Sequence, residues 1–361
     1  MSSHPTLGAH TGAEIQSQPE RWQQSLDHLA ATGEARRIAQ ALGRQRRWLF
    51  IGCGSSFYLA QTAAACWRAV TGWEARALPA SELLLFPELA WDREASWQPV
   101  LISRSGATSE VLRAADFLAA QRQPFLAVTC TPGEALERRA AATLRPTGAE
   151  ERSTVMTLSF TSMLLAIQYL GAEFAGDEAG REALRRMPAQ ARPFVDQTRD
   201  AVQAFVARHD FADYVWLGQG PYYGLACEGA LKVQEMSCSY AQSFHTLEFR
   251  HGPKSIVAPD TLVLFQLSAA GGGEERGVLE EVKALGGVTA VVASRGGEGG
   301  RDAADLWLEA GAGGDPAGER AWLAPRLAPA QWLGLFTGRK KGLDSDHPRH
   351  LNRVVLLPQG G

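Results

Sequence analysis

The sequence predicts an α/β protein built from two similar domains, each a doubly wound parallel sheet with helices on both faces, giving three layers. A length of 361 residues suits two domains of ordinary size, or one duplicated unit. Short apolar runs alternate with helical stretches of roughly 10–15 residues, which is typical of parallel strands joined by crossover helices. A pattern of strand, glycine turn and helix also occurs twice in the chain.

Glycines mark this repeat. The apolar run 48–51 ends at Gly52, and the similar run 214–217 ends at Gly218, nearly half a chain later. A helical stretch follows each glycine turn. The next units correspond as well: strand, helix and strand are expected at 99–102, 110–121 and 125–129 in the first half, and at 262–265, 274–285 and 288–293 in the second.

The flanks of the repeat predict additional parts. Residues 13–45 have apolar side chains near helical spacing and predict an N-terminal helical arm. Pro188 and Pro193 predict a linker between the halves, and 354–357 predicts an edge strand or an ordered flap in the tail. The expected boundaries are 1–45 for the arm, 46–192 for the first domain, 193–340 for the second and 341–361 for the tail.

Composition excludes several classes of function. The 36 basic and 39 acidic residues nearly cancel, so a protein that coats nucleic acid or anionic lipid is not expected. No apolar run approaches the roughly 20 residues that cross a bilayer, and no membrane association is predicted. The five cysteines form no CxxC pair, which argues against a disulfide framework or a zinc ribbon. We therefore expect a cytoplasmic protein.

Serine-rich loops follow the first two strands of the first half. They contain Ser55, Ser56, Ser103, Ser105 and Thr108, and each opens a helix. Hydroxyls, backbone N–H groups and the positive end of a helix dipole suit a phosphate monoester. Ordinary helix capping is the alternative explanation, because Ser and Thr are preferred caps.

Two nucleotide-binding motifs do not fit these loops. Phe57 occupies the third glycine position of a dinucleotide fingerprint that would begin at Gly52, and no P-loop motif occurs. The corresponding loop of the second half, 268–273, has lost nearly all of its hydroxyls. One phosphate pocket per chain, in the first half, is therefore expected.

A helix of the second half carries three charged residues on one face. Glu228, Lys232 and Glu235 are spaced i, i+4 and i+7 within a mostly apolar stretch. A solvated ion pair would explain them, but charges on a packed helix need partners or a function. A glutamate in such a place is a candidate general base.

His251 precedes a Gly-Pro pair and is expected in a loop, where an imidazole can reach a ligand. Glu248, Arg250 and Lys254 place charge beside it. His245 and His251 lack the HExxH spacing, so no zinc site of that kind is predicted. A structural histidine is the alternative.

Four motifs occur together and in order: GCGSS at 52–56, SRSGAT at 103–108, EGALKVQE at 228–235 and RHGP at 250–253. Together they resemble the tandem sugar isomerase (SIS) domain family, over residue 46 to the C-terminus. This resemblance implies that the five hydroxyl residues of the loops hold a sugar phosphate. It also implies that Glu235 moves a proton between C1 and C2, with Lys232 and Glu228 beside it.

The resemblance implies further features of the site. His251 resembles a ring-opening histidine that the partner subunit supplies in glucosamine-6-phosphate synthase, so a homodimer with sites shared across its interface is expected. Neither a metal nor a cofactor is implied. Further substrate-binding residues implied by the family are Cys53, Gly54, Arg104, Thr157 and Arg353.

Three differences from the synthase indicate which branch of the family this sequence resembles. No glutaminase domain precedes the repeat, so no ammonia source is expected within the chain. Arg104 stands where the synthase has glutamine, and Arg353 stands where it has a lysine; arginine cannot form a Schiff base. These residues, with the segment 14–19, resemble the galactosamine-6-phosphate deaminase/isomerase branch, also described as tagatose-6-phosphate ketose/aldose isomerase.

The expected function is therefore an amino-sugar-6-phosphate deaminase/isomerase that releases ammonia. One alternative is a simple phosphosugar aldose–ketose isomerase. Another is a non-catalytic phosphosugar-binding regulator, although about 45 residues before the first strand is short for a DNA-binding domain. The sequence does not identify the sugar epimer.

Overall fold

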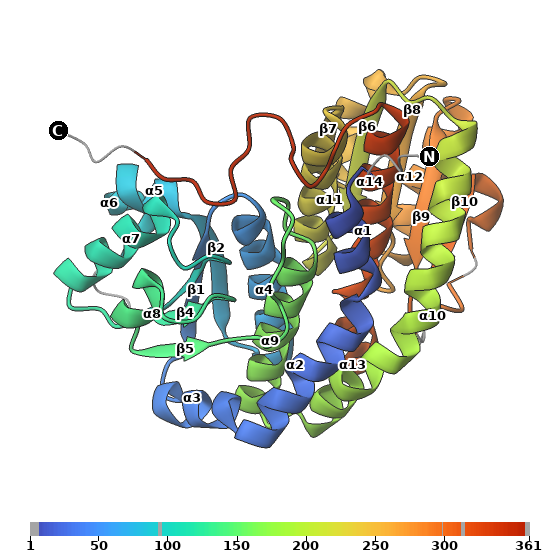
Figure 1. Cartoon of the computed structure of the whole chain (residues 1–361). Coiled ribbons are helices and arrows are strands. Elements are labelled where there is room, and N and C mark those ends of the chain that lie inside the picture. The colour runs from blue at the N-terminus through green and yellow to red at the C-terminus, as the bar shows by residue number, and fades with distance from the viewer. Residues whose placement is uncertain (1–6, 93–95, 298, 312–314, 358–361) are drawn as a thin grey trace. The chain divides into compact units, whose positions relative to one another are not determined.

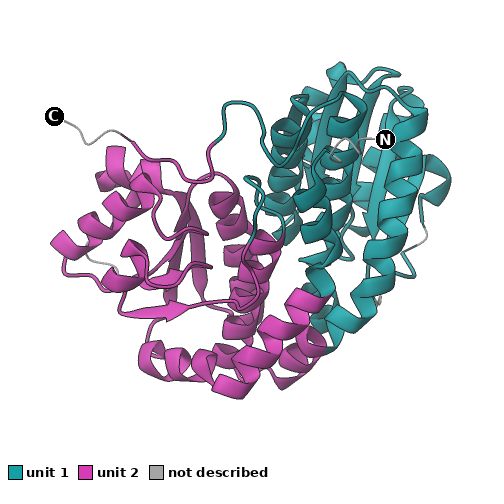
Figure 2. Ribbon diagram, viewed as in Figure 1, with its two compact units in different colours: residues 1–19, 151–157, 186–351 teal, residues 20–150, 158–185, 352–361 magenta. Residues whose placement is uncertain are grey.

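The computed structural model describes residues 7–92, 96–297, 299–311 and 315–357 (Figure 1). Its contacts define two compact units, each described separately below (Figure 2). Unit 1 consists of residues 1–19, 151–157 and 186–351, and unit 2 consists of residues 20–150, 158–185 and 352–361. Each unit therefore combines segments that are far apart in the sequence. The expected domain boundaries, drawn along the chain, remain a prediction.

Unit 2 is built on a five-stranded sheet in the order β2-β1-β3-β4-β5, with every pair of neighbours parallel. Its strands are β1 (Arg47–Gly52), β2 (Glu74–Pro79), β3 (Gln98–Ile102), β4 (Leu126–Val128) and β5 (Ala142–Leu144). The helices that lie mainly in this unit are α2 (Gln18–Thr32), α3 (Glu34–Leu42), α4 (Ser55–Thr71), α5 (Ala80–Leu85), α6 (Pro87–Ala90), α7 (Ser109–Ala120), α8 (Ala135–Arg139) and α9 (Leu158–Ala175).

Alternation along β1 gives this sheet two covered faces. Leu49 and Ile51 pack with α5, α7 and α8 in one core. Trp48 and Phe50 point to the other face, where their rings lie against Trp67 of α4. Because successive strand residues face opposite sides, both sets are buried and the expected three-layer arrangement is confirmed for this unit.

Unit 1 contains the second five-stranded parallel sheet, in the order β10-β9-β8-β6-β7. Its strands are β6 (Asp213–Gly218), β7 (Tyr240–His245), β8 (Thr261–Gln266), β9 (Val288–Ala293) and β10 (Leu306–Glu309). Its helices are α1 (Ala9–Gln16), most of α10 (Glu178–Arg208), α11 (Pro221–Ser237), α12 (Gly272–Ala284), α13 (Pro316–Ala321) and α14 (Ala328–Lys340), with short 3₁₀ turns η1 (Glu248–Arg250), η2 (Pro253–Ile256), η3 (Arg301–Ala303) and η4 (Pro325–Leu327).

Helices cover both faces of this sheet too. Val215 and Leu217 of β6 share a buried core with α12. Trp216 faces the other side, where α11 lies so close that a Cβ added at Gly229 would come within 2.5 Å of the indole. Small residues on a helix allow such close approach to a sheet.

The predicted duplication is confirmed by the backbone. β7-β6-β8-β9-β10 repeats the order β2-β1-β3-β4-β5. The turns before α4 and α11 have almost the same dihedral angles, with φ 53° and ψ −126° at Gly54 and φ 56° and ψ −127° at Gly220. A Cβ at Gly52 would lie 2.5 Å from backbone atoms of the following helix, and one at Gly218 would lie 2.4 Å away. Both turns therefore require glycine for the same steric reason.

The stretch at Pro188 and Pro193, which was expected as a linker, is helical. Both prolines lie inside α10, a continuous helix of 31 residues. An interior proline costs a helix about 3 kcal/mol, because it lacks an N–H and its ring crowds the preceding turn. Met187, Ala191 and Val195 are fully buried at four-residue spacing. This buried stripe offsets the cost, and tertiary packing overrides the local signal.

Two other regions relate to earlier expectations. One helix among the described residues, α9, is long and apolar enough to span a bilayer, and 83% of that window is buried inside the protein. A core helix of a soluble protein meets the same criteria.

The segment 354–357 forms no strand, so the ordered flap is the alternative that agrees with its hydrogen bonds.

Candidate functional site

Two hydroxyl-bearing loops of unit 2 lie at one edge of its sheet. β1 and β3 are hydrogen-bonded parallel neighbours, so the loops that follow them start side by side. Ser55 and Ser56 begin α4 and are 6% and 4% exposed, and Ser103 directly after β3 is 2% exposed. Carboxyl ends of strands in open α/β sheets are where ligands bind. The structure brings the predicted phosphate-binding residues of the two loops together.

The second loop is held by its own hydroxyls. The Ser103 and Thr108 hydroxyl oxygens lie 3.0 Å apart, and the Gly106 N–H donates to Ser103 Oγ at 3.2 Å. The Ala107 N–H donates to Ser105 Oγ at 3.2 Å. Thr108 is the N-cap of α7, yet its side chain makes no capping hydrogen bond. Ordinary capping therefore does not account for this hydroxyl.

The C-terminal tail contacts the same loop. Arg104 donates from Nη2 to the carbonyl of Arg353 at 2.9 Å. The Ser109 N–H, at the start of α7, donates to the carbonyl of Val355 at 3.2 Å, and the Leu357 N–H donates to Ser109 Oγ at 3.0 Å. The Arg353 side chain is exposed. Both predicted arginines therefore lie at the start of α7, although Arg353 contributes its backbone there.

Cys53 and Gly54 have mainly structural surroundings. Cys53 packs against the hydrophobic core of unit 2, and burial raises the pKa of its thiol to about 11, with the charge of Glu110 adding to the shift. Gly54 has a positive φ that L side chains rarely adopt. At neutral pH the thiol is protonated and is a poor nucleophile.

A carboxylate–lysine group lies on α11 of unit 1. The Lys232 ammonium is 3.1 Å from Glu228 Oε1 and donates a short hydrogen bond to Glu235 Oε2. The side chains of Lys232 and Glu228 are 0% exposed, whereas that of Glu235 is 18% exposed. The predicted face of α11 is therefore formed, and Glu235 is its accessible member.

The packing of α11 fixes this group. A Cβ on Gly334 of α14 would lie 2.8 Å from the carbonyl oxygen of Lys232, and one on Gly338 would lie 2.3 Å from that of Met236. Burial lowers the pKa of Lys232, but Glu228 and then Glu235 raise it by more, so the net shift is upward. Lys232 is held as a cation between two carboxylates.

His251 lies at the end of η1 with an exposed side chain. Within the described residues, no hydrogen bond or ion pair joins its ring to the α11 group. The charges beside it in sequence have other partners: Arg250 bonds Glu281 at 2.8 Å, and Lys254 bonds the same carboxylate at 3.3 Å. These two cations pair with α12, so they are not evidence for a charged ligand at His251.

Thr157 belongs to the segment 151–157 of unit 1. Its N–H and its hydroxyl both donate to Glu151 Oε1, at 2.7 and 3.0 Å, and its carbonyl accepts from Gln331 at 3.2 Å. The Glu14 carboxylate accepts hydrogen bonds from the backbone N–H of Arg152 and from Ser153. Glu14, Glu151 and Gln331 are positioning residues that the motif analysis missed.

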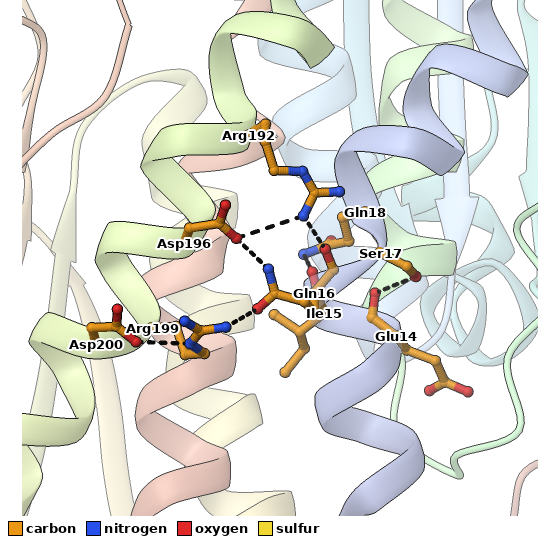
Figure 3. A network of polar contacts seen from close by, with 9 residues as sticks. All are labelled: Glu14, Ile15, Gln16, Ser17, Gln18, Arg192, Asp196, Arg199 and Asp200. Atoms are coloured by element: carbon orange, nitrogen blue, oxygen red, sulfur yellow. Dashed lines mark hydrogen bonds and ion pairs between the residues drawn. The ribbon is translucent and has the colours of Figure 1, made fainter.

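The segment 14–18 is fastened on its other side to α10 (Figure 3). Gln16 bonds Asp196 through its amide nitrogen and Arg199 through its amide oxygen, and its carbonyl accepts from Arg192 at 2.8 Å. Gln18 donates to Gln331 at 2.7 Å, and Gln331 in turn holds Thr157. The acid and amide side chains of segment 14–18 were the only indication in the sequence that this segment makes polar contacts with the rest of unit 1.

The equivalent loop in unit 1 is filled by the protein itself. After β8, the Glu275 carboxylate accepts from the Ser268 N–H at 2.7 Å and from the Ser268 hydroxyl at 3.1 Å. Glu319 accepts from the Ala269 N–H and from the Tyr222 hydroxyl. A carboxylate bound at the start of α12 takes the donors that a phosphate would need at this loop.

The fold and the loops together define a duplicated α/β protein with hydroxyl-rich loops at one sheet edge of unit 2 and a buried carboxylate–lysine group in unit 1. Residues 41–172 match the model of the SIS domain family. The sheet of unit 1 repeats the same strand order.

Curated relatives share sequence across most of the chain. Glutamine–fructose-6-phosphate aminotransferase (isomerizing) of Methanothermobacter thermautotrophicus is 26% identical over 337 residues, which is 92% of this chain and 55% of the relative. The enzyme of the same name from Streptococcus pyogenes serotype M1 is 29% identical over 274 residues, 72% of this chain and 43% of the relative. The chain spans about half the length of the curated relatives it matches.

Solved structures are similar over nearly the whole chain. Glucosamine-6-phosphate deaminase from Thermotoga maritima has a TM-score of 0.81 and 27% identity, covering 97% of this chain and all of that one. Tagatose-6-phosphate ketose/aldose isomerase from Escherichia coli has a TM-score of 0.85 at 23% identity, covering 98% of each chain. The second likeness concerns the fold alone.

Proposed function

We propose that this protein is an amino-sugar-6-phosphate deaminase/isomerase. The single observation that carries the proposal is the gradient of exposure on α11, where Lys232 and Glu228 are sealed from solvent and Glu235 is not. Lys232 holds Oε2 of Glu235, so the second carboxylate oxygen can accept and return a proton. Similarity to enzymes named for glucosamine 6-phosphate and fructose 6-phosphate supports the substrate class.

The proposed reaction needs phosphate binding by the hydroxyl loops and proton transfer by Glu235. Loops 53–56 and 103–108 of unit 2 bind the sugar phosphate through hydroxyls, N–H groups and the start of α7. Glu235 removes the proton from C2 and returns it at C1 through an enolamine, which makes a ketose imine. Addition of water to that imine and loss of the amine release ammonia and the ketose phosphate. No cofactor is needed for this proton transfer.

His251 is proposed to assist ring opening in a homodimer. Its side chain is exposed, and within the described part of the chain no hydrogen bond or ion pair joins it to Glu235. A histidine supplied by the partner subunit would explain that separation. Arg353 is proposed to contact the substrate through its exposed guanidinium, without the covalent chemistry open to a lysine.

Substitution of Glu235→Gln tests the assignment. We expect turnover to fall below detection, because the amide cannot accept the proton, while the Kd for the phosphosugar changes by less than roughly threefold. Glu280→Gln, on the exposed face of α12, is the matched control and should keep full activity. Full activity of Glu235→Gln would refute the assignment.

An ammonia assay separates the proposal from its alternatives. Galactosamine 6-phosphate and glucosamine 6-phosphate are incubated with the protein, and ammonia and ketose phosphate are both measured. Ketose without ammonia from the matching hexose phosphates would indicate a simple isomerase. Tight binding with no turnover across the panel would indicate a regulator.

A further inference from the structure

Unit 1 contains a cavity whose lining includes no residue of α11. It measures about 410 Å³ and is formed at the carboxyl ends of β8 and β9. The loop after β8, the start of α12 and the glycine turn 296–297 after β9 line it. A volume of this size is within the range of small-molecule sites.

The cavity is lined by cations and hydroxyls. Arg276 and Arg295 line it with Ser268 and Ser294, and the lining contains no carboxylate side chain. Two carboxylates bond the edge of the lining on the β8 side: Glu275 accepts from the Ser268 N–H and hydroxyl, and Glu319 accepts from the Ala269 N–H. A concave surface with two guanidinium groups is suited to an anion.

These two arginines are exceptional among the cations around the sheet. Arg250, Lys283 and Arg301 each pair with a carboxylate, at 2.8, 2.6 and 3.1 Å. Among the residues that the structure describes, neither Arg276 nor Arg295 lies within salt-bridge distance of one. Their charge is available to a ligand.

A buried arginine supports the cavity from behind. Arg326 is 0% exposed, donates to the carbonyls of Leu267 and Val292 at the ends of β8 and β9, and stacks on a tyrosine ring. It also donates from Nη2 to Ser294 Oγ at 2.7 Å. Because that oxygen accepts from Arg326, the Ser294 O–H must point elsewhere and can serve as a donor in the cavity.

The glycine turn 296–297 forms part of the cavity wall. Gly296 has φ +83°, and no atom lies within 4 Å of a Cβ built on it, so the backbone is open at this point. Gly272, at the start of α12, also lines the cavity, but Glu275 already bonds the donors of the adjoining loop. The groups that would recognise a phosphate here are therefore the two arginines and the Ser294 hydroxyl.

We propose that this cavity binds a small phosphorylated metabolite, whose phosphate is held by Arg276 and Arg295. This site is separate from the hydroxyl loops of unit 2, and its recognition is based on arginine rather than serine. In the duplicated sheet Glu275 bonds Ser268 in the loop after β8, and the proposed site lies between this loop and the turn after β9.

Hydrogen exchange of the full chain locates the site. Three probes are used at saturating millimolar concentration: inorganic phosphate, glucosamine 6-phosphate and adenosine monophosphate. We expect at least one to protect the amides of 268–276 and 293–297, and the arm that does so identifies the kind of phosphate ester. No protection of these amides by any of the three would overturn the proposal.

Variants assign the protection to the arginines. Arg276→Gln with Arg295→Gln should weaken binding at this site by about 100-fold, at roughly tenfold for each lost charged hydrogen bond. Arg276→Lys with Arg295→Lys keeps the charge and should retain most of the affinity. Arg301→Gln is the matched control and should bind as the wild type does. Unchanged protection in the double glutamine variant, with wild-type thermal unfolding, would refute the site.

Discussion

Replacement of Lys232 by methionine gives a stringent test of the α11 group. The ammonium is fully buried and lies 3.1 Å from the equally buried Glu228. At that distance, and at an effective dielectric constant near 20, two unit charges attract by about 5 kcal/mol. Removing one member of a buried pair leaves an uncompensated charge and typically costs about 3–5 kcal/mol. We expect Lys232→Met to destabilise unit 1 by this amount.

Urea unfolding measures the effect. With an m-value of about 3 kcal/mol/M, a loss of 3–5 kcal/mol lowers the midpoint by roughly 1–1.7 M. Hydrogen exchange of 221–237 assigns the transition to unit 1. Lys283→Met is the matched control, since Lys283 is 39% exposed in its pair with Asp305, and an exposed pair contributes about 0–1 kcal/mol.

A double variant distinguishes charge from packing. Lys232→Met with Glu228→Met removes both charges and should recover most of the lost stability, because no buried carboxylate is then left alone. The reasoning is refuted if Lys232→Met shifts the midpoint no more than Lys283→Met. It is also refuted if the double variant is no more stable than the single one.

Two further predictions concern individual residues of unit 2. Cys53, whose pKa is about 11, has roughly 100-fold less thiolate at pH 8 than a thiol of ordinary pKa near 9. Iodoacetamide should therefore label the exposed Cys238 first and Cys53 only as the pH approaches 11. Mass spectrometry of the peptides checks this order, and equal labelling of the two cysteines at pH 8 would contradict it. Gly52→Ala should destabilise the protein by about 1–3 kcal/mol, because the new Cβ would lie 2.5 Å from backbone atoms. A Cβ at Gly273 has no atom within 4 Å, so Gly273→Ala should be tolerated. Equal urea midpoints for the two variants would contradict the steric argument.

The repeated architecture could be predicted because its signals are local. A buried strand, a glycine that a side chain cannot replace and an apolar helix follow one another within about 25 residues, and Gly52 and Gly218 mark both copies. The face of α11 was predictable for the same reason, since Glu228, Lys232 and Glu235 are fixed by helical spacing alone.

Interactions between distant segments could not be predicted. The carboxylate of Glu14 meets the loop at Ser153 across 139 residues, and nothing in the local sequence indicates that contact. Pro188 is the opposite case. A proline locally disfavours a helix, but the burial of its neighbours in α10 outweighs that local preference. Arg250 places charge beside His251 in the sequence, although Glu281, which pairs with it, is 31 residues away.

Unit 1 is formed by segments that are far apart in the sequence, and this affects how it folds during synthesis. Helix α1 leaves the ribosome before the rest of unit 1, yet the Thr11 N–H and hydroxyl bond Asp346, which is 335 residues later. At roughly 5–20 residues per second, that interval lasts roughly 17–67 s. Throughout this time the apolar side chain of Ile15, fully buried in the finished protein, has no native core to enter. The contact between α1 and Asp346 can therefore form only after residue 346 has been synthesised, long after α1 itself.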